Sequence, residues 1–337
     1  MASAHGNQGG SLRLGDALRP IVLGRGASLS EPGIELRRPE LALGVALGGR
    51  VLGYALIDQT RPPPPYGGLT TAPGISLAAA HTLMSSAALQ LGLFEVPRAA
   101  HHCLLLTSPE MDASEVDDRR SEFLDAIRPL TERGLCRIVY TRDAKTLTPS
   151  LAQRGLVASA SGATFAALEH LGIDVAGAQL ALYREADPGR RLAEQLVRQG
   201  MRVVANGEQA LRAISDVLVV DGTVWKPDRS RAQNPRARII VMLGALIGPD
   251  SLERPFAGRG ILMLPDTITT SGAILAPHLV AEGFDDDGAV AQCFELARSV
   301  THRVLQRDDG SMPLPLLVRS LARENLRAAA SNGNELR

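Results

Sequence analysis

Apolar and polar positions alternate along residues 40–58, and the alternation breaks at the glycine pair 48–49. A period of two is typical of a strand with one buried face, and adjacent glycines supply the backbone freedom of a tight turn. We therefore predict a β-hairpin, with residues 51–57 as its second strand. Short apolar runs at residues 103–106 and 137–141 predict two further strands.

Two helices are predicted between these strands. Residues 77–93 are mostly apolar or small and follow Ser76, whose hydroxyl suits a helix N-cap. Residues 112–133 carry many charges around an apolar face, which is typical of an amphipathic surface helix. The stretch from Arg61 to Pro65 is rich in proline and lacks backbone donors, so we expect it to be extended and to stay out of the middle of a sheet.

After residue 172 the predicted elements alternate between strands and helices, which implies a parallel, doubly wound sheet with right-handed crossovers. The strands are expected at residues 179–183, 202–205, 217–220, 238–243 and 260–264, and the helices at 189–199 and around 209–213. A helix of small residues at 149–171 should join the two halves, because small side chains allow close approach. Helices at 288–305 and 314–329 should pack back over this junction.

The chain has 337 residues, more than one hydrophobic core usually supports, so we predict an α/β protein of two domains. Residues 16–148 would form an N-terminal α/β domain, and residues 149–305 a Rossmann-like domain. Residues 306–337 would form a helix that returns to the first domain, followed by a frayed end. Residues 1–15 lack the apolar centre of a signal peptide, so we expect a disordered tail.

Composition narrows the partners. The formal net charge is +0, which argues against nucleic acid or an anionic membrane as a main partner. No apolar run approaches the roughly 20 residues that a membrane span needs. Cys103, Cys136 and Cys293 are few and distant, as is typical of reduced thiols, and we expect a cytoplasmic protein.

Several motifs occur in one order along the chain, and together they resemble the glutamate/leucine/phenylalanine/valine dehydrogenase family. The motifs are Pro65-Tyr66-Gly67-Gly68-Leu69, the helix 77–93, Pro97-Arg98-Ala99-Ala100-His101-His102, Gln153-Arg154-Gly155, Gly177-Ala178-Gln179 and Leu264-Pro265-Asp266 through Gly272. The resemblance covers residues 40 to 330 or so. It implies a substrate domain followed by a Rossmann-like domain, and a homo-oligomer that is at least a dimer through the N-terminal sheet.

The resemblance also implies three lysines that this chain lacks. Their positions fall on Tyr66, Gln90 and His102, and the whole chain has only Lys145 and Lys226. A carboxylate clamp needs a fixed cation, and neither a phenol nor an amide can neutralise a carboxylate. Ordinary oxidative deamination is therefore predicted to be lost.

One hypothesis is that the site has kept its shape and acquired a different chemistry. His102 stands where the resemblance implies a catalytic lysine, and histidine can act as acid or base near neutral pH. Asp143 falls close to the position of the family's catalytic Asp, so we predict His102 and Asp143 as a catalytic pair. The alternative is a histidine without a catalytic role, which replaced the lysine once that lysine was no longer needed and is hydrogen-bonded to its neighbours. A metal site is not expected, since on an extended chain at most His101 and Cys103 share a side.

A substrate-binding set is predicted around this pair, and two parts of it have a structural alternative. The set is Tyr66, Gly67, Gly68, Gln90, Arg154 and Thr270. The glycine pair could instead be an ordinary turn after the prolines, and Arg154 could form an interdomain ion pair. The acidic run 285–287 is interpreted as a helix N-terminal cluster favoured by the helix dipole.

The dinucleotide fingerprint is degenerate. Gly-x-Gly-x-x-Gly lets backbone amides approach a pyrophosphate at a helix N-terminus. This chain has Arg184, Ala186 and Gly189 at the three glycine positions, so no cofactor is expected. NAD or NADP remains an alternative, because Arg184, Arg190 and Arg191 could partly compensate.

Three functions stay open. The leading hypothesis is a non-redox enzyme acting on an amino acid, a keto acid or an imine-like small molecule. The second is a catalytically inactive scaffold or regulatory partner of an active paralogue. The third is an atypical NAD(P)-dependent amino-acid dehydrogenase.

Overall fold

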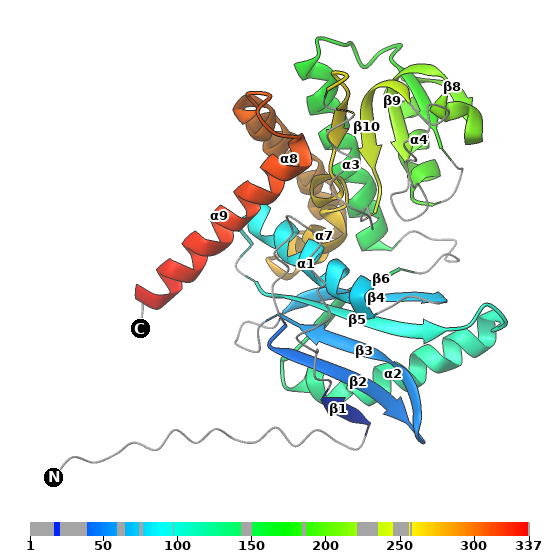
Figure 1. Cartoon of the computed structure of the whole chain (residues 1–337), viewed down its shortest axis with the longest axis vertical. Coiled ribbons are helices and arrows are strands. Elements are labelled where there is room, and N and C mark those ends of the chain that lie inside the picture. Colours follow the sequence, from blue (N-terminus) through cyan, green and yellow to red (C-terminus); the bar gives the residue numbers. More distant parts are fainter. Residues whose placement is uncertain are drawn as a thin grey trace.

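The computed structural model describes residues 17–20, 39–58, 65–73, 77–96, 98–142, 150–183, 187–220, 235–244, 256 and 258–335. These residues form two β-sheets at opposite ends of the long axis of the molecule, with helices between and beside them (Figure 1). The predicted α/β class with two domains is therefore confirmed.

The first sheet has six strands in the order β1-β2-β3-β5-β4-β6. The strands are β1 (Leu18–Pro20), β2 (Leu41–Leu47), β3 (Arg50–Ile57), β4 (Tyr66–Pro73), β5 (Ala100–Thr107) and β6 (Arg137–Arg142). The predicted hairpin is confirmed: β2 and β3 pair antiparallel, and the two turn glycines take φ values of 56° and 82°. Strand β4 pairs in parallel with both β5 and β6, so the sheet is mixed.

One helix covers each face of this sheet. Helix α1 (Leu77–Leu93) has the predicted bounds, and its Met84 and Leu91 pack against Leu104 of β5. Helix α2 (Ala113–Glu132) covers the other face, where Phe123 is fully buried. Asp112 caps α2 and forms a capping box with Glu115, which explains why the helix begins there.

The second sheet has five parallel strands in the order β11-β10-β9-β7-β8. They are β7 (Gln179–Leu182), β8 (Arg202–Asn206), β9 (Ile214–Val220), β10 (Arg236–Met242) and β11 (Leu262–Leu264). The strand order reverses between β7 and β9, which makes this the topological switch point of a doubly wound sheet. Helix α4 (Gly189–Arg198) follows β7, and the helix expected near residue 209 is a short 3-10 turn, η1 (Gly207–Leu211).

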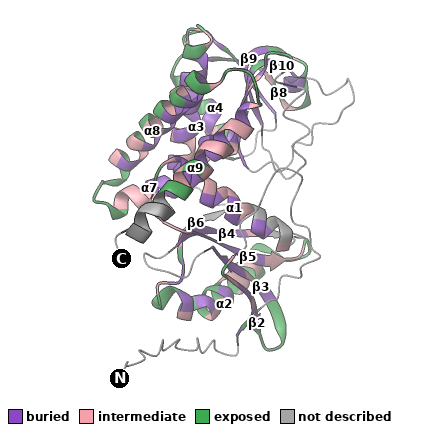
Figure 2. Ribbon diagram, turned by 60° about the vertical axis from the view of Figure 1, so that its left-hand side comes forward, coloured by how far each residue is buried: buried purple, intermediate pink, exposed green. Residues whose placement is uncertain are grey.

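Helix α3 (Leu151–His170) joins the two halves and packs backbone to backbone with its neighbours. A Cβ atom on Gly155 would lie 2.3 Å from the Gly272 carbonyl oxygen, and one on Gly162 would lie 2.2 Å from the Phe294 carbonyl oxygen. The expectation that small residues permit close approach is therefore confirmed. Figure 2 shows how buried positions predominate along this helix.

The remaining helices follow β11. They are α6 (Asp266–Thr269), α7 (Gly272–Ala281), α8 (Asp286–Arg307) and α9 (Leu314–Glu335). The sequence pattern did not predict α6 or α7. Helix α9 continues to Glu335, so the frayed end expected after residue 329 is wrong in its bounds.

Candidate functional site

Three of the predicted site residues lie on the side of the first sheet that faces α1. Tyr66 begins β4, Gln90 lies late in α1, and His102 is the third residue of β5, directly paired with Gly68. Their relative exposures are 1%, 7% and 0%, so all three are buried. The positions where the resemblance implies lysines are thus occupied by buried side chains without an ammonium group.

His102 is held inside the sheet. Its Nε2 atom shares a hydrogen bond with the Thr70 hydroxyl on β4 over 3.0 Å. The expected partner Asp143 lies outside the described residues.

The neighbouring His101 explains one of the glycines. Its Nε2 donates to the carbonyl oxygen of Arg137 on β6 over 2.7 Å, so the imidazole crosses β4 above Gly67. A Cβ atom on Gly67 would lie 1.8 Å from the His101 carbonyl oxygen and 3.1 Å from its Cγ. Burial lowers the pKa of His101 to about 4, against the backbone hydrogen bond that raises it, so the ring is neutral near pH 7.

The glycine pair therefore lies within the central strand β4, and the alternative of an ordinary turn is wrong. The reason is that Gly67 has neighbours on both sides, β5 and β6, and must remain small for the imidazole of His101 to pass. A strand of Tyr-Gly-Gly-Leu gives little β signal, which is why the pattern did not reveal it.

Gln90 and Thr270 meet across the domain boundary. The Gln90 amide donates to the Thr270 hydroxyl over 2.8 Å, and that hydroxyl donates in turn to the Asp266 carbonyl oxygen over 2.8 Å. One turn earlier on α1, the Ser86 hydroxyl donates to the Asp266 carboxylate over 3.1 Å. Two predicted substrate-binding residues are thus brought together and bound to each other.

Tyr66 is surrounded by groups that the sequence pattern did not single out. The guanidinium groups of Arg98 and Arg137 lie 5.1 Å and 5.7 Å from its ring centroid, which are cation–π distances. The ring of His278 on α7 approaches edge-on at 5.7 Å. Among the described residues the buried Tyr66 hydroxyl has no hydrogen-bond partner. Burial lowers the pKa of His278; Arg98 lowers it further, and Glu282 opposes the shift.

Arg154 is engaged at the start of α8. It forms an ion pair with Asp287 and approaches Asp286 at 4.0 Å. Asp285 accepts a hydrogen bond from the Gly288 amide over 2.7 Å and caps the helix. The interpretation of this acidic run as a helix N-terminal cluster is confirmed.

The start of α4 is the place where a dinucleotide pyrophosphate would lie in a Rossmann-like domain. Arg184 and Ala186 lie outside the described residues, while Asp187 forms ion pairs with Arg190 at 3.6 Å and Arg191 at 3.2 Å. Arg190 and Arg191, two of the arginines expected to compensate for the lost glycines, are thus already paired with a carboxylate. A Cβ atom on Gly189 would contact Leu182 at 3.3 Å, so this glycine serves the packing of helix on strand.

The end of β7 is also occupied by an internal contact. The Tyr183 hydroxyl donates to the carboxylate of Glu208, just beyond β8, over 3.1 Å. An acidic residue after the second strand is the usual acceptor for a ribose hydroxyl. The described part of this region therefore offers a dinucleotide neither a free arginine at the helix N-terminus nor an unengaged ribose acceptor.

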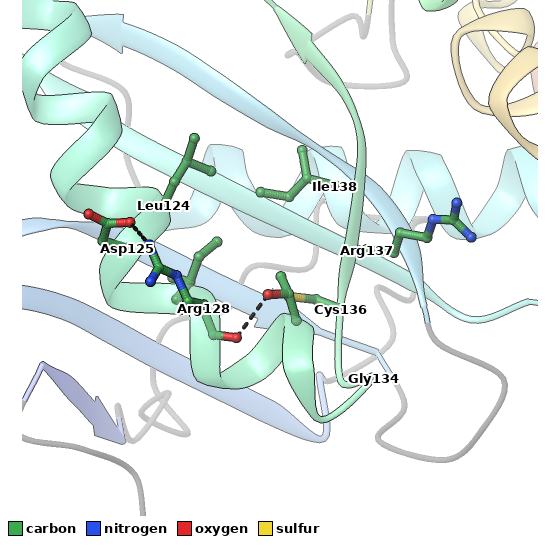
Figure 3. A pocket seen from close by; sticks show the side chains of 9 residues that line it. Leu124, Asp125, Arg128, Gly134, Cys136, Arg137 and Ile138 are labelled. Atoms are coloured by element: carbon green, nitrogen blue, oxygen red, sulfur yellow. Dashed lines mark hydrogen bonds and ion pairs between the residues drawn. The ribbon is translucent and has the colours of Figure 1, made fainter.

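A cavity of about 570 Å³ lies on the opposite side of the first sheet, between α2 and β6 (Figure 3). Its lining residues are Leu124, Asp125, Ile127, Arg128, Thr131, Gly134, Cys136, Arg137 and Ile138. Figure 3 shows the Arg137 side chain directed away from the other lining side chains, and Asp125 paired with Arg128. Burial raises the pKa of Cys136 to about 12, so its thiol is not a nucleophile at neutral pH.

A second cavity of about 290 Å³ is lined by side chains of α3, α4 and α8, among them Arg154 and Arg191. Neither cavity is lined by Tyr66, Gln90 or His102. Within the described ranges no group of three or more His, Cys, Asp or Glu side chains could hold a metal ion. None of the helices in those ranges has the length and apolar character to cross a membrane.

No protein-family model matches this sequence, and no curated protein matches it by sequence. Solved structures do. The hetero-hexameric glutamate dehydrogenase of Thermus thermophilus, solved with Leu bound, is similar with a TM-score of 0.67 and 17% identity over 86% of this chain and 89% of that chain. The L-tryptophan dehydrogenase of Nostoc punctiforme gives a TM-score of 0.62 and 14% identity over 87% and 97% of the two chains. Glutamate dehydrogenase 2 of Plasmodium falciparum gives 0.68 and 10% over 89% and 86%.

These similarities span both sheets and the helices between them, in agreement with the resemblance found in the motifs. At 10–17% identity these similarities show the fold alone. They do not show which chemistry the residues described above perform. The chain has the two-domain fold of the amino-acid dehydrogenases.

Proposed function

We propose that this chain is a non-catalytic protein with the amino-acid dehydrogenase fold, which acts as a scaffold or regulatory partner of an active dehydrogenase. The observation that carries the proposal is the burial and bonding of the three residues at the positions where the resemblance implies lysines. Tyr66, Gln90 and His102 carry no ammonium group, all three are buried, and Gln90 and His102 are engaged in internal hydrogen bonds.

Deamination of an amino acid requires groups that these side chains do not supply. A lysine that binds the substrate carboxylate supplies a full positive charge, whereas the Gln90 amide supplies a dipole and is already bound to Thr270. A general base must reach the proton that it abstracts, directly or through one water molecule. The imidazole of His102 has no exposed surface and is bound to Thr70 within the sheet.

The cofactor side supports the same proposal. Asp187 places a carboxylate beside the start of α4 and pairs with Arg190 and Arg191. A pyrophosphate at this helix end would have to displace that carboxylate and lie beside it. We therefore expect NAD and NADP to bind weakly or not at all.

The partner role is favoured by the family architecture that the resemblance implies, an oligomer built through the N-terminal sheet. The hetero-hexameric glutamate dehydrogenase of Thermus thermophilus is, as its name states, an assembly of more than one kind of subunit. We propose that this chain is a homo-oligomer, or one kind of subunit in such a mixed assembly.

A second candidate function is favoured by one observation. The buried hydroxyl of Tyr66, without a hydrogen-bond partner among the described residues, lies next to two guanidinium groups at the end of the first sheet. Such groups could recognise a small carboxylate, as the hypothesis of a non-redox enzyme on an amino acid or keto acid requires. In that hypothesis His102 and Asp143 would be the catalytic pair, as the resemblance implies from their positions in the sequence.

The test is coexpression with the amino-acid dehydrogenase of the same cell. Native mass spectrometry should detect an oligomer containing both chains, and the kcat or KM of the active enzyme should change when this chain is present. A matched control replaces this chain by an equal amount of an unrelated protein of similar size. Separate homo-oligomers with unchanged kinetics would contradict the partner role.

A further inference from the structure

We propose that the two domains of this chain are locked into a single rigid body, with the space between them filled by the protein's own side chains. The inference deepens the proposed function, on which its biological meaning rests. A fixed joint would present one constant shape to a partner subunit. Its evidence is four contacts that lie at different places along the domain boundary.

The first attachment is a shared hydrophobic core. Ile274, Leu275 and Ala276 of α7 pack in one buried cluster with residues of α1 and of the first sheet. Their relative exposures are 1%, 2% and 0%, comparable to those of Met84 and Leu91 of α1. Domains joined by a small polar interface move relative to each other by default, but a buried apolar interface opposes such motion because opening exposes it to water.

The second attachment is a polar clamp. The Gln90 amide donates to the Thr270 hydroxyl, and the Ser86 hydroxyl donates to the Asp266 carboxylate, so α1 is bound to α6 at two successive turns. A buried amide or hydroxyl that loses its partner carries the cost of its own desolvation. Opening the domains here would leave Gln90 without its partner unless water entered.

The third attachment is the C-terminal helix. The first half of α9 belongs to the core of the second domain, where Leu314, Val318 and Ala322 are buried. Its second half lies against α1, where Asn325 donates to the Gly92 carbonyl oxygen over 3.1 Å. The same helix is thus fastened to both sides of the boundary, and Figure 1 shows it crossing obliquely beside α1.

A fourth contact lies at the far end of the joint. The rings of Tyr66 and His278 are 5.7 Å apart, and Arg98 approaches Glu282 at 3.9 Å, so the end of the first sheet is held to α7. A hinge needs one line of flexible residues about which everything else can rotate. Within the part of the chain that the structure describes, the attachments through α6, α7 and α9 oppose such a rotation, because turning about any one of them would strain the others.

The test is a distance measurement by pulsed electron–electron double resonance on the full chain, with the labelled protein diluted in an excess of unlabelled chain so that labels on neighbouring protomers do not contribute. Spin labels are placed at Ser121→Cys on α2 and Gln199→Cys after α4, both exposed, while Cys103, Cys136 and Cys293 are buried and stay unlabelled. We expect one narrow distance distribution that is unchanged by NAD, by NADP or by an amino acid. Two populations, or a shift on adding any of these, would overturn the proposal.

Variants then test which contacts hold the two domains together. Gln90→Ala combined with Thr270→Val should broaden the distribution, as should the milder Asn325→Ala, while Gln306→Ala on the exposed face of α8 serves as the matched control. Unchanged distance distributions in the Gln90/Thr270 double variant and in Asn325→Ala would overturn the role given to these residues. Turnover assays on the same samples separate the two proposals, since an active enzyme with a narrow distribution contradicts the proposed function and leaves the rigid joint intact.

Discussion

The side chains of Gln90 and Thr270 form a hydrogen bond of 2.8 Å across the domain boundary. The two residues are 180 positions apart in the sequence, and each was predicted separately to bind a substrate. In the folded chain each is the other's partner. A cleft that the resemblance assigns to a ligand is thus closed by protein groups at this point.

The first prediction concerns the stability of this contact. Gln90→Ala should lower the free energy of unfolding by about 1–3 kcal/mol, because the variant loses a buried hydrogen bond and packing. The Thr270 hydroxyl retains its bond to Asp266, which favours the lower part of that range. Urea unfolding measures the change, and Gln306→Ala, at an exposed position, should stay within about 0.5 kcal/mol of the parent. Equal effects of the two variants would show that Gln90 is not a structural contact.

The second prediction concerns the crossing of His101 over Gly67. Gly67→Ala should destabilise the protein by more than about 2 kcal/mol or prevent folding, since its Cβ would lie 1.8 Å from a backbone oxygen. The control is Gly48→Asn in the hairpin turn, where nothing lies within 4 Å and asparagine tolerates the positive φ. Thermal unfolding of both variants provides the comparison. A stable Gly67→Ala protein would mean that the backbone of β5 does not approach Gly67 this closely.

The third prediction is a pH dependence. The folded pKa of His101 is about 4, below its ordinary value of 6.5, so the unfolded chain binds more protons between these two values. The stability that neutral His101 contributes is therefore fully present above pH 6.5 and is lost as the pH falls toward 4. The loss should amount to about 3 kcal/mol. The lowered pKa of His278 acts in the same direction.

Urea midpoints measured between pH 7.5 and pH 4.5 or so test this dependence. His101→Gln should be less stable at pH 7.5, and its stability should fall less steeply with acid than that of the parent. Because carboxylates also titrate at the acid end, the difference between the two proteins carries the result. Parallel curves for parent and variant would contradict the assignment.

The fourth prediction concerns the thiols. Burial raises the pKa of Cys136 and Cys293 to about 12, and burial also raises that of Cys103 well above its ordinary value. The thiolate is the reactive form, so all three should react slowly with a disulfide reagent in the native protein at pH 8 and quickly in denaturant. A thiol that reacts rapidly before unfolding would show that its surroundings are open to solvent.

Much of the fold could be predicted from local patterns. The hairpin, helix α1 with its bounds at Leu77 and Leu93, and the parallel alternation of the second sheet all follow from periodicity and capping. Strand β4 could not be predicted, because Gly67 and Gly68 carry no side chains and its β character depends on neighbours on both sides. Helix α7 was also missed, since it contains Pro277 and nearly all of its residues are apolar, which leaves no amphipathic pattern.

The candidate site shows the same limit. The order and spacing of the motifs along the chain were enough to place Tyr66, Gln90 and His102 at the positions where the resemblance implies lysines. Their partners come from distant segments: Thr270 after β11 and His278 on α7. No local pattern encodes such contacts, so sequence reasoning could identify which residues were exchanged but not what they bind.

The most direct test of the central claim is a turnover assay on the purified full chain. Formation of reduced nicotinamide is measured with each standard amino acid and NAD or NADP, and its consumption with the corresponding keto acids and ammonium. An active dehydrogenase of the same fold serves as the positive control. The account predicts no turnover above background in either direction, and steady turnover that follows enzyme concentration with any substrate would contradict it.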